Sequence, residues 1–306
     1  MHRLTLSVRN LDDPDTRAAF ERVVRTASAV DGQPPFSDQS LIDVTTGART
    51  LIFAVEPQDP PAEPHDFAVI GVAILGQGEL EFVVEPEWRG NGYGKKALEG
   101  VLGNCAPAVK VWAHGDHPAS RKLAATFGFE AIRTLLQLRR SAAPEAAASE
   151  ARAATSTNRD DLTITPFRIG EDETDWLAVN ALAFATHPEQ GKMTIDDLRA
   201  READTWFDAE DFLLARDADG TLVGFNWLKV EDGEGEIYAI GVHPDHAGRG
   251  IGRTLMEAGL ERLEGRDLDT IALYVEADNT AAVNLYRSLG FTDHTIDVQY
   301  SRPIAS

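Results

Sequence analysis

The feature that most constrains this chain is a motif that occurs twice, far apart. Residues 82–94 read FVVEPEWRGNGYG and residues 240–252 read IGVHPDHAGRGIG, so each copy is an apolar strand ending in V-x-P, a turn, and a G-x-G that opens an amphipathic helix. Gly250 follows Gly92 by 158 residues, and the matching pair Gly128 and Gly290 is 162 residues apart. An interval this long is typical of duplicated domains, because solenoid repeats span only about 20–50 residues. The motif therefore predicts one fold unit used twice.

A segment of different composition separates the two copies. Residues 141–161, SAAPEAAASEARAATSTNRDD, are rich in Ala, Ser, Thr and charge and lack the large apolar side chains that a core needs. Such a composition predicts a solvated linker. The halves on either side, 1–140 and 162–306, are each long enough to bury a core of their own.

Strands and helices alternate in the second half, and the first half repeats the later part of that order. A hairpin signal, DADG, separates two apolar runs, and Thr194 is a plausible N-cap. We expect strands at 163–167, 212–216, 222–230, 236–242, 271–277 and 294–300, and helices at 172–185, 193–203, 250–263 and 279–289. This order predicts a mixed sheet flanked by helices in each half, an α/β (α+β) fold.

Charge and cysteine content exclude several classes of protein. Asp and Glu total 50 against 29 Lys and Arg, a formal charge of −21 that would repel nucleic acid and anionic membranes. Cys105 is the single cysteine, so an intrachain disulfide cannot form. The start, MHRLTLSVRN, lacks the apolar segment of a signal peptide, and no apolar run approaches the roughly 20 residues of a membrane span. We expect a cytoplasmic chain with neither nucleic acid nor membrane partners.

The repeated motif has the chemistry of a phosphate-binding turn. Glycines allow backbone N–H groups to approach a pyrophosphate, and the N-terminus of the following helix favours its negative charge. The turn lacks the Gly-Lys-Ser/Thr ending of a P-loop and the third glycine of the dinucleotide fingerprint. R-x-x-G-x-G from Arg89 to Gly94, after V-x-P, instead resembles the acyl-CoA loop of the GNAT superfamily of N-acetyltransferases. Residues 279–291, NTAAVNLYRSLGF, resemble the last core helix of that family. The resemblance implies two tandem GNAT-like domains with acetyl-CoA as co-substrate.

The two copies differ in the groups that acetyl transfer needs. Moving an acetyl group from a thioester to an amine requires a base for the ammonium and an acid for the departing thiolate. Glu236 begins the strand that leads to the second loop, and Tyr286 lies in the last helix. At the two intervals these residues correspond to Gly78 and Ala124. We therefore place catalysis in the second half, with Glu236 as base and Tyr286 as acid. The first half is read as a degenerate copy still able to hold CoA.

Further segments carry a narrower resemblance. AVDG (29–32), VWAHG (111–115), AFATHPEQG (183–191), TWFD (205–208), GFNWLKV (224–230) and LYVEADNTAAV (273–283) resemble the mycothiol synthase family of tandem GNAT enzymes. The resemblance implies acetylation of the cysteinyl amine of cysteinyl-glucosaminyl-inositol, the last step to mycothiol. The acceptor residues that it implies are Asp38, where a longer Glu is usual, Glu189, Lys229, Glu236 and Tyr274.

The same resemblance implies two CoA sites. Ala247 stands where the family usually has Gln or Arg, with little expected consequence because the contacts there are mostly made by backbone. The first site would comprise Phe82, Val83, Val84, Gly90, Asn91, Gly92, Tyr93, Gly94 and Lys95. The second would comprise Ile240, Gly241, Val242, Ala247, Gly248, Arg249, Gly250, Ile251, Gly252, Arg253, Asn279, Thr280, Ala281, Ala282, Val283 and Asn284.

Two alternatives stay open at this point. One is a tandem acetyltransferase that acts on a protein N-terminus or an aminoglycoside-like amine, against which the HPEQG segment argues. The other is a non-catalytic acyl-CoA-binding regulator, which retention of Glu236 and Tyr286 disfavours. The histidine pairs His114/His117 and His243/His246 fall in loops without Cys or an obvious third ligand, so no metal is expected. We expect a monomer whose partner is a small thiol-sugar substrate.

Overall fold

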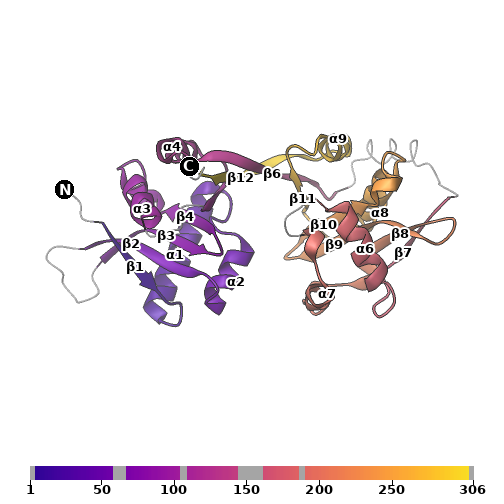
Figure 1. The fold of residues 1–306 in the computed structure, drawn as a ribbon, viewed down its shortest axis with the longest axis horizontal. Coiled ribbons are helices and arrows are strands. Elements are labelled where there is room, and N and C mark those ends of the chain that lie inside the picture. The colour runs from indigo at the N-terminus through magenta and orange to yellow at the C-terminus, as the bar shows by residue number, and fades with distance from the viewer. Residues whose placement is uncertain (1–3, 58–66, 104–108, 144–160, 186–189, 303–306) are drawn as a thin grey trace. The chain divides into compact units, whose positions relative to one another are not determined.

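The computed structural model describes residues 4–57, 67–103, 109–143, 161–185 and 190–302. Most of its strands and helices are labelled in Figure 1. Contacts group them into two compact units. Unit 1 comprises Met1–Leu136, Glu276–Asp278 and Thr295–Ser306, and unit 2 comprises Gln137–Val275 and Asn279–His294. Each unit contains a mixed sheet with helices against it, which confirms the predicted fold class.

The sheet of unit 1 has the strand order β1-β2-β3-β4-β5-β12. Strands β4 and β5 are parallel, and the other neighbours are antiparallel. Adjacent residues of β2 point to opposite faces: Phe53 packs with α1 and α2, and Ile52 packs with α3 and α4. The elements are β1 (Thr5–Arg9), α1 (Pro14–Asp31), α2 (Asp38–Thr46), β2 (Thr50–Pro57), β3 (Phe67–Gly76), β4 (Glu79–Val84), α3 (Tyr93–Leu102), β5 (Lys110–His114), α4 (Pro118–Phe127) and β12 (Thr292–Ser301).

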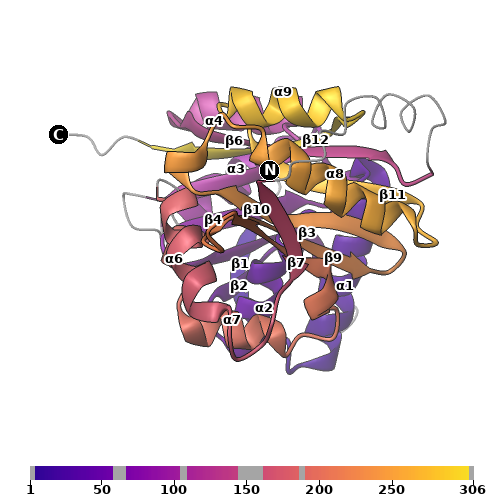
Figure 2. The same ribbon diagram turned by 90° about the vertical axis from the view of Figure 1, so that its right-hand side faces the viewer.

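The sheet of unit 2 has the order β6-β11-β10-β9-β8-β7, with β10 and β11 parallel and β7 to β10 antiparallel. Helices α6 and α8 cover opposite faces (Figure 2). Trp227 packs with Trp176 of α6, whereas the amide of the adjacent Asn226 donates to the Leu255 carbonyl of α8. The elements are β6 (Glu130–Ser141), β7 (Leu162–Pro166), α6 (Glu173–Ala183), α7 (Ile195–Glu202), β8 (Phe212–Asp217), β9 (Leu222–Glu231), β10 (Glu234–Val242), α8 (Ile251–Glu264), β11 (Thr270–Glu276) and α9 (Thr280–Ser288).

The last strand of each repeat is divided between the two units. Residues 297–301 of β12 pair with β5 in unit 1, and the part of β6 from Gln137 onward belongs to unit 2, beside β11. The boundaries predicted from the repeat, 1–140 and 162–306, stay a prediction. In each unit, the sheet includes residues from the opposite half of the sequence.

Several local predictions are confirmed. Thr194 caps α7 in a reciprocal capping box with Asp197, and a hairpin joins β8 to β9 across the DADG turn. Most of the predicted linker, residues 144–160, lies outside the described residues. Within the described ranges, no helix has the length and apolar character needed to cross a bilayer.

Candidate active site

Both glycine turns adopt the same backbone conformation. Gly92 and Gly250 each have φ 82° and ψ 0°, and each is followed at once by a helix, α3 or α8. A left-handed φ of this size strains any residue with a Cβ. The helix N-terminus directly after the turn presents backbone N–H groups and the positive end of the helix dipole. The geometry is that of the predicted anion-binding turn, present once in each unit.

A parallel strand pair opens beside each turn. In unit 2 the pairing of β10 with β11 runs from Glu234 to Ile237, while β10 continues along β9 to Val242. In unit 1 the pairing of β4 with β5 runs from Glu79 to Glu81, while β4 continues along β3 to Val84. Backbone groups at the ends of β4 and β10 therefore lie at a gap in the ladder, next to the glycine turn. These ends are the predicted CoA segments 82–84 and 240–242.

A β-bulge in β10 corrects one expected correspondence. The register with β9 shifts between Ile237 and Ala239, so one residue more separates the carboxylate position from the glycine turn in unit 2 than in unit 1. Glu236 pairs with Ala272, and Glu79 pairs with Lys110, which precedes Ala272 by the same 162 residues that separate Gly128 from Gly290. The residue equivalent to Glu236 is therefore Glu79, and the correspondence with Gly78 is wrong by one position.

The candidate acid, Tyr286, lies inside unit 2. Its side chain on α9 is buried, with its ring 6.2 Å from that of Phe291 in an edge-on arrangement. Burial raises the pKa of the Tyr286 phenol to about 12, so the phenol keeps its proton until a stronger base forms beside it. Ala124, at the matching position of α4, offers no such proton.

The candidate base faces a lysine across the sheet. Glu236 on β10 is the direct cross-strand partner of Lys229 on β9, so both side chains lie on one face. Lys229 Nζ lies 2.8 Å from Glu231 Oε2 and 5.3 Å from the centre of the Trp206 ring. Tyr274 lies two residues beyond Ala272, the partner of Glu236 on β11, and therefore points to the same face. The structure thus brings together Glu236, Lys229 and Tyr274.

The other two predicted acceptor residues come from other parts of the chain. Asp38 is the first residue of α2, in unit 1, directly after the N-cap Ser37. Glu189 lies outside the described residues. The roles of both residues stay predictions.

Unit 1 contains a cavity of about 340 Å³ on its glycine turn. Its apolar wall includes Phe82, Val84 and Leu123, which agrees with a site for the pantetheine arm of CoA. The sequence did not predict that His114 would form part of a polar wall of this cavity, or that Tyr300 of β12 would line it. The polar wall could not be found because its members are scattered along the chain and meet only in the folded sheet.

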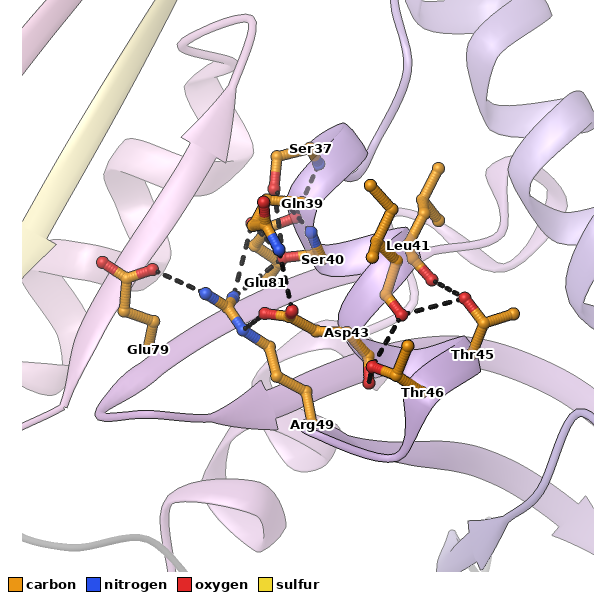
Figure 3. Close-up of polar contacts among 11 residues, drawn as sticks. Ser37, Gln39, Ser40, Leu41, Asp43, Thr45, Thr46, Arg49, Glu79 and Glu81 are labelled. Carbon is orange, nitrogen blue, oxygen red and sulfur yellow. Dashed lines mark hydrogen bonds and ion pairs between the residues drawn. The ribbon is translucent and has the colours of Figure 1, made fainter. Parts of the chain in front are cut away.

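A buried polar network lies behind His114 (Figure 3 shows the part around Glu81). Ser40 Oγ donates to Glu81 Oε1 at 2.6 Å and the backbone N–H of Ser37 donates to Oε2 at 2.9 Å. His114 Nε2 lies 3.6 Å from Glu81, and its Nδ1 lies 3.0 Å from Asp297 on β12. Burial works against both charges. The ion pairs and hydrogen bonds outweigh it, so the pKa of His114 rises to about 9 and that of Glu81 falls to about 2.

The network also occupies Glu79, the equivalent of the candidate base. Arg49 Nη2 donates to Glu79 Oε2 at 3.1 Å (Figure 3), and Gln299 Nε2 on β12 donates to Oε1 at 3.0 Å. Arg49 also pairs with Asp43 at 2.9 Å. A carboxylate whose two oxygens already accept from these donors has fewer lone pairs left for an incoming ammonium. Unit 1 therefore has a carboxylate at the position of the candidate base, but this carboxylate is hydrogen-bonded to the side chains of Arg49 and Gln299.

The charge on His114 predicts a pH-dependent stability. A histidine whose folded pKa is raised stabilises the fold fully below its unfolded pKa of 6.5, and that contribution is lost as the pH rises through about 9. The loss should be on the order of 3 kcal/mol between those limits. We expect the melting temperature of unit 1, followed by calorimetry, to fall over this range in the wild type. His114→Gln should melt lower at pH 6 and show little alkaline decline. The same decline in the variant would assign it to another group.

Two units built alike, each with a left-handed glycine turn beside an opened parallel strand pair, define a tandem acyltransferase of the GNAT class. The model of the "Acetyltransferase (GNAT) family" matches residues 176–291, which span the candidate base, the second turn and Tyr286. A GCN5-related N-acetyltransferase from Sphaerobacter thermophilus has a similar structure, with a TM-score of 0.74 at 20% identity over 99% of this chain and 96% of that one. A tandem GNAT protein from the clavulanic acid biosynthesis pathway gives 0.66 at 15% identity, over 99% of both chains. These two likenesses show the fold.

Relatives in sequence narrow the assignment. A mycothiol acetyltransferase from Clavibacter sepedonicus is 44% identical over 297 residues, 94% of this chain and 93% of that one. A mycothiol acetyltransferase from Thermobispora bispora is 41% identical over 98% of this chain and its own full length. The chain belongs to the mycothiol acetyltransferase family.

Proposed function

We propose that this protein transfers the acetyl group of acetyl-CoA to the cysteinyl amine of cysteinyl-glucosaminyl-inositol, the reaction that completes mycothiol. Family membership over nearly the whole chain supports this acceptor. The observation that carries the catalytic assignment is the asymmetry between the units. Unit 2 has a buried phenol at Tyr286, whereas unit 1 has Ala124 at the matching position and so lacks a proton donor there.

The proposed chemistry divides between the two side chains. Acetyl-CoA supplies the thioester. Glu236 accepts the proton of the substrate ammonium, directly or through a water, which frees the amine lone pair for attack on the thioester carbonyl. Tyr286 donates its O–H to the CoA sulfur as the carbon–sulfur bond breaks, and the resulting phenolate takes up the second proton, which the attacking nitrogen loses as the amide forms. The amide, CoA thiol and one released proton balance the reaction.

Unit 1 has a different role in this proposal. Its cavity and glycine turn hold a CoA that is not turned over, because the acid is missing and the equivalent carboxylate is occupied. We also propose a monomeric chain that acts in the cytoplasm without metal, membrane or nucleic acid. The net charge of −21 and the single cysteine support this part.

Acceptor preference tests the proposed function. The purified chain should acetylate cysteinyl-glucosaminyl-inositol with a kcat/KM well above that for free cysteine or a peptide N-terminus, because only the conjugate reaches the polar groups around Lys229 and Tyr274. Steady-state rates with each amine at saturating acetyl-CoA measure this. Equal kcat/KM values for the conjugate, cysteine and the peptide would contradict the proposed acceptor and indicate an acetyltransferase of broad specificity.

Lys229 gives a sharper test of the acceptor face. Lys229→Met removes the ammonium but keeps most of the alkyl chain, so the KM for the conjugate should rise about ten- to a hundredfold, as for one charged hydrogen bond. The Kd of CoA measured by calorimetry should not change. Glu231→Gln is the matched control, since it removes a partner of Lys229 and leaves the ammonium. Glu189→Ala should behave like Lys229→Met. An unchanged KM in both would place the acceptor elsewhere.

A further inference from the structure

A buried glutamine on β6 forms a hydrogen bond with Tyr274, one of the predicted acceptor residues. Gln137 lies on β6, in the part of that strand that belongs to unit 2, and is 8% exposed. Its Nε2 donates to the hydroxyl of Tyr274 at 2.7 Å. Tyr274 is itself 48% exposed, so one end of this hydrogen bond lies in the interior and the other at the surface where an acceptor would bind. A side chain from the first half of the sequence thus contacts a predicted acceptor residue of the second.

The repeat contains the same glutamine twice. Gln299 on β12 follows Gln137 by 162 residues, the interval that relates the glycines after α4 and α9. Gln299 is 1% exposed, pairs in register with Trp112, and donates to Glu79, which occupies the position of Glu236. Trp112 precedes Tyr274 by the same interval. In each unit, then, the strand contributed by the opposite half carries a buried amide to the polar face near the candidate base position.

We propose that Gln137 is a positioning residue for the acceptor, acting through Tyr274. This rests on the proposed function in one respect, that Tyr274 contacts the acceptor. Because the amide N–H donates, the phenol oxygen of Tyr274 is the acceptor in this bond. The ring is held by a partner that is itself buried, so its hydroxyl position is fixed before substrate arrives. A fixed Tyr274 would contact a polar group of the substrate, the cysteinyl carbonyl or a sugar hydroxyl.

A double-mutant cycle tests the proposal. Gln137→Leu keeps the volume and removes the donor, so the KM for the conjugate should rise about three- to tenfold with kcat and the Kd of CoA unchanged. Gln137→Glu should raise KM further, because an ionised carboxylate only accepts and the hydrogen bond that positions the Tyr274 phenol would have to reverse. In a Tyr274→Phe background, Gln137→Leu should change KM by less than about twofold. An equal effect in both backgrounds, or a wild-type KM in Gln137→Glu, would overturn it.

Gln299→Leu is the matched control. It removes the equivalent buried amide from unit 1, so it should lower the melting temperature without changing the KM for the conjugate. If the wild type fails to acetylate the conjugate, the proposed function fails. The Gln137–Tyr274 coupling is then measured by the same cycle on the free energy of unfolding. Additive unfolding energies in that cycle would refute the contact itself.

Discussion

Tyr286→Phe should lower kcat by roughly 10²- to 10⁴-fold, the usual contribution of one general acid. The variant loses only the hydroxyl, so the packing of the buried ring against Phe291 is kept and the fold should not change. Glu236→Gln should lower kcat by a similar factor at constant side-chain volume. Rapid-mixing and steady-state measurements of CoA release at saturating substrates give both values.

The matching position in unit 1 separates the roles of the two units. Ala124→Tyr, the reverse change in unit 1, should add no activity because Glu79 stays bound to Arg49. Normal turnover in both Tyr286→Phe and Glu236→Gln would refute the mechanism while leaving the fold intact.

Gly250→Val should abolish efficient use of acetyl-CoA, whereas Gly92→Val should not. The two glycines share φ 82° and ψ 0°, so the substitutions are matched in strain, about 1–3 kcal/mol each. A side chain at Gly250 would also block backbone donors from the pyrophosphate of the reacting CoA. Loss of two such charge-assisted bonds would lower kcat/KM about 10²- to 10⁴-fold.

The expected result for Gly92→Val is a change in kcat/KM of less than about threefold at full occupancy of unit 2. Calorimetry should then show two CoA sites in the wild type and one in each variant. Equal loss of activity in both variants would mean that unit 1 takes part in turnover.

The repeat predicted more of this molecule than its composition did. Glycine turns, their helices and the strands before them are local in sequence, so the interval between Gly92 and Gly250 was enough to predict both turns and the helices after them. The β-bulge was not readable, because an extra residue in β10 changes the register without changing the hydrophobic alternation around it. Because of that single residue, the fixed interval of 158 residues matches Glu236 to Gly78 rather than to Glu79.

The sequence also did not predict that β6 and β12 each contribute residues to the unit formed mainly by the other half of the chain. Alternation predicts that 294–300 is a strand, but alternation does not say which sheet the strand joins. The pairing of β12 with β5, and the ion pair between Asp297 and His114, depend on contacts between residues almost two hundred positions apart. The sequence does contain a signal for Gln137. It aligns with Gln299 when the two Gly-Phe turns are superposed, and a polar residue that recurs at the same position of an apolar strand indicates a role in both units.

The thiol content of cells that lack this protein tests the central claim most directly. Mass spectrometry of derivatised extracts should find cysteinyl-glucosaminyl-inositol accumulated and its N-acetyl product lost. The wild-type chain should restore the product, and the Tyr286→Phe chain should not. An unchanged pool of acetylated thiol in the deletion, with no build-up of the unacetylated conjugate, would contradict the assignment.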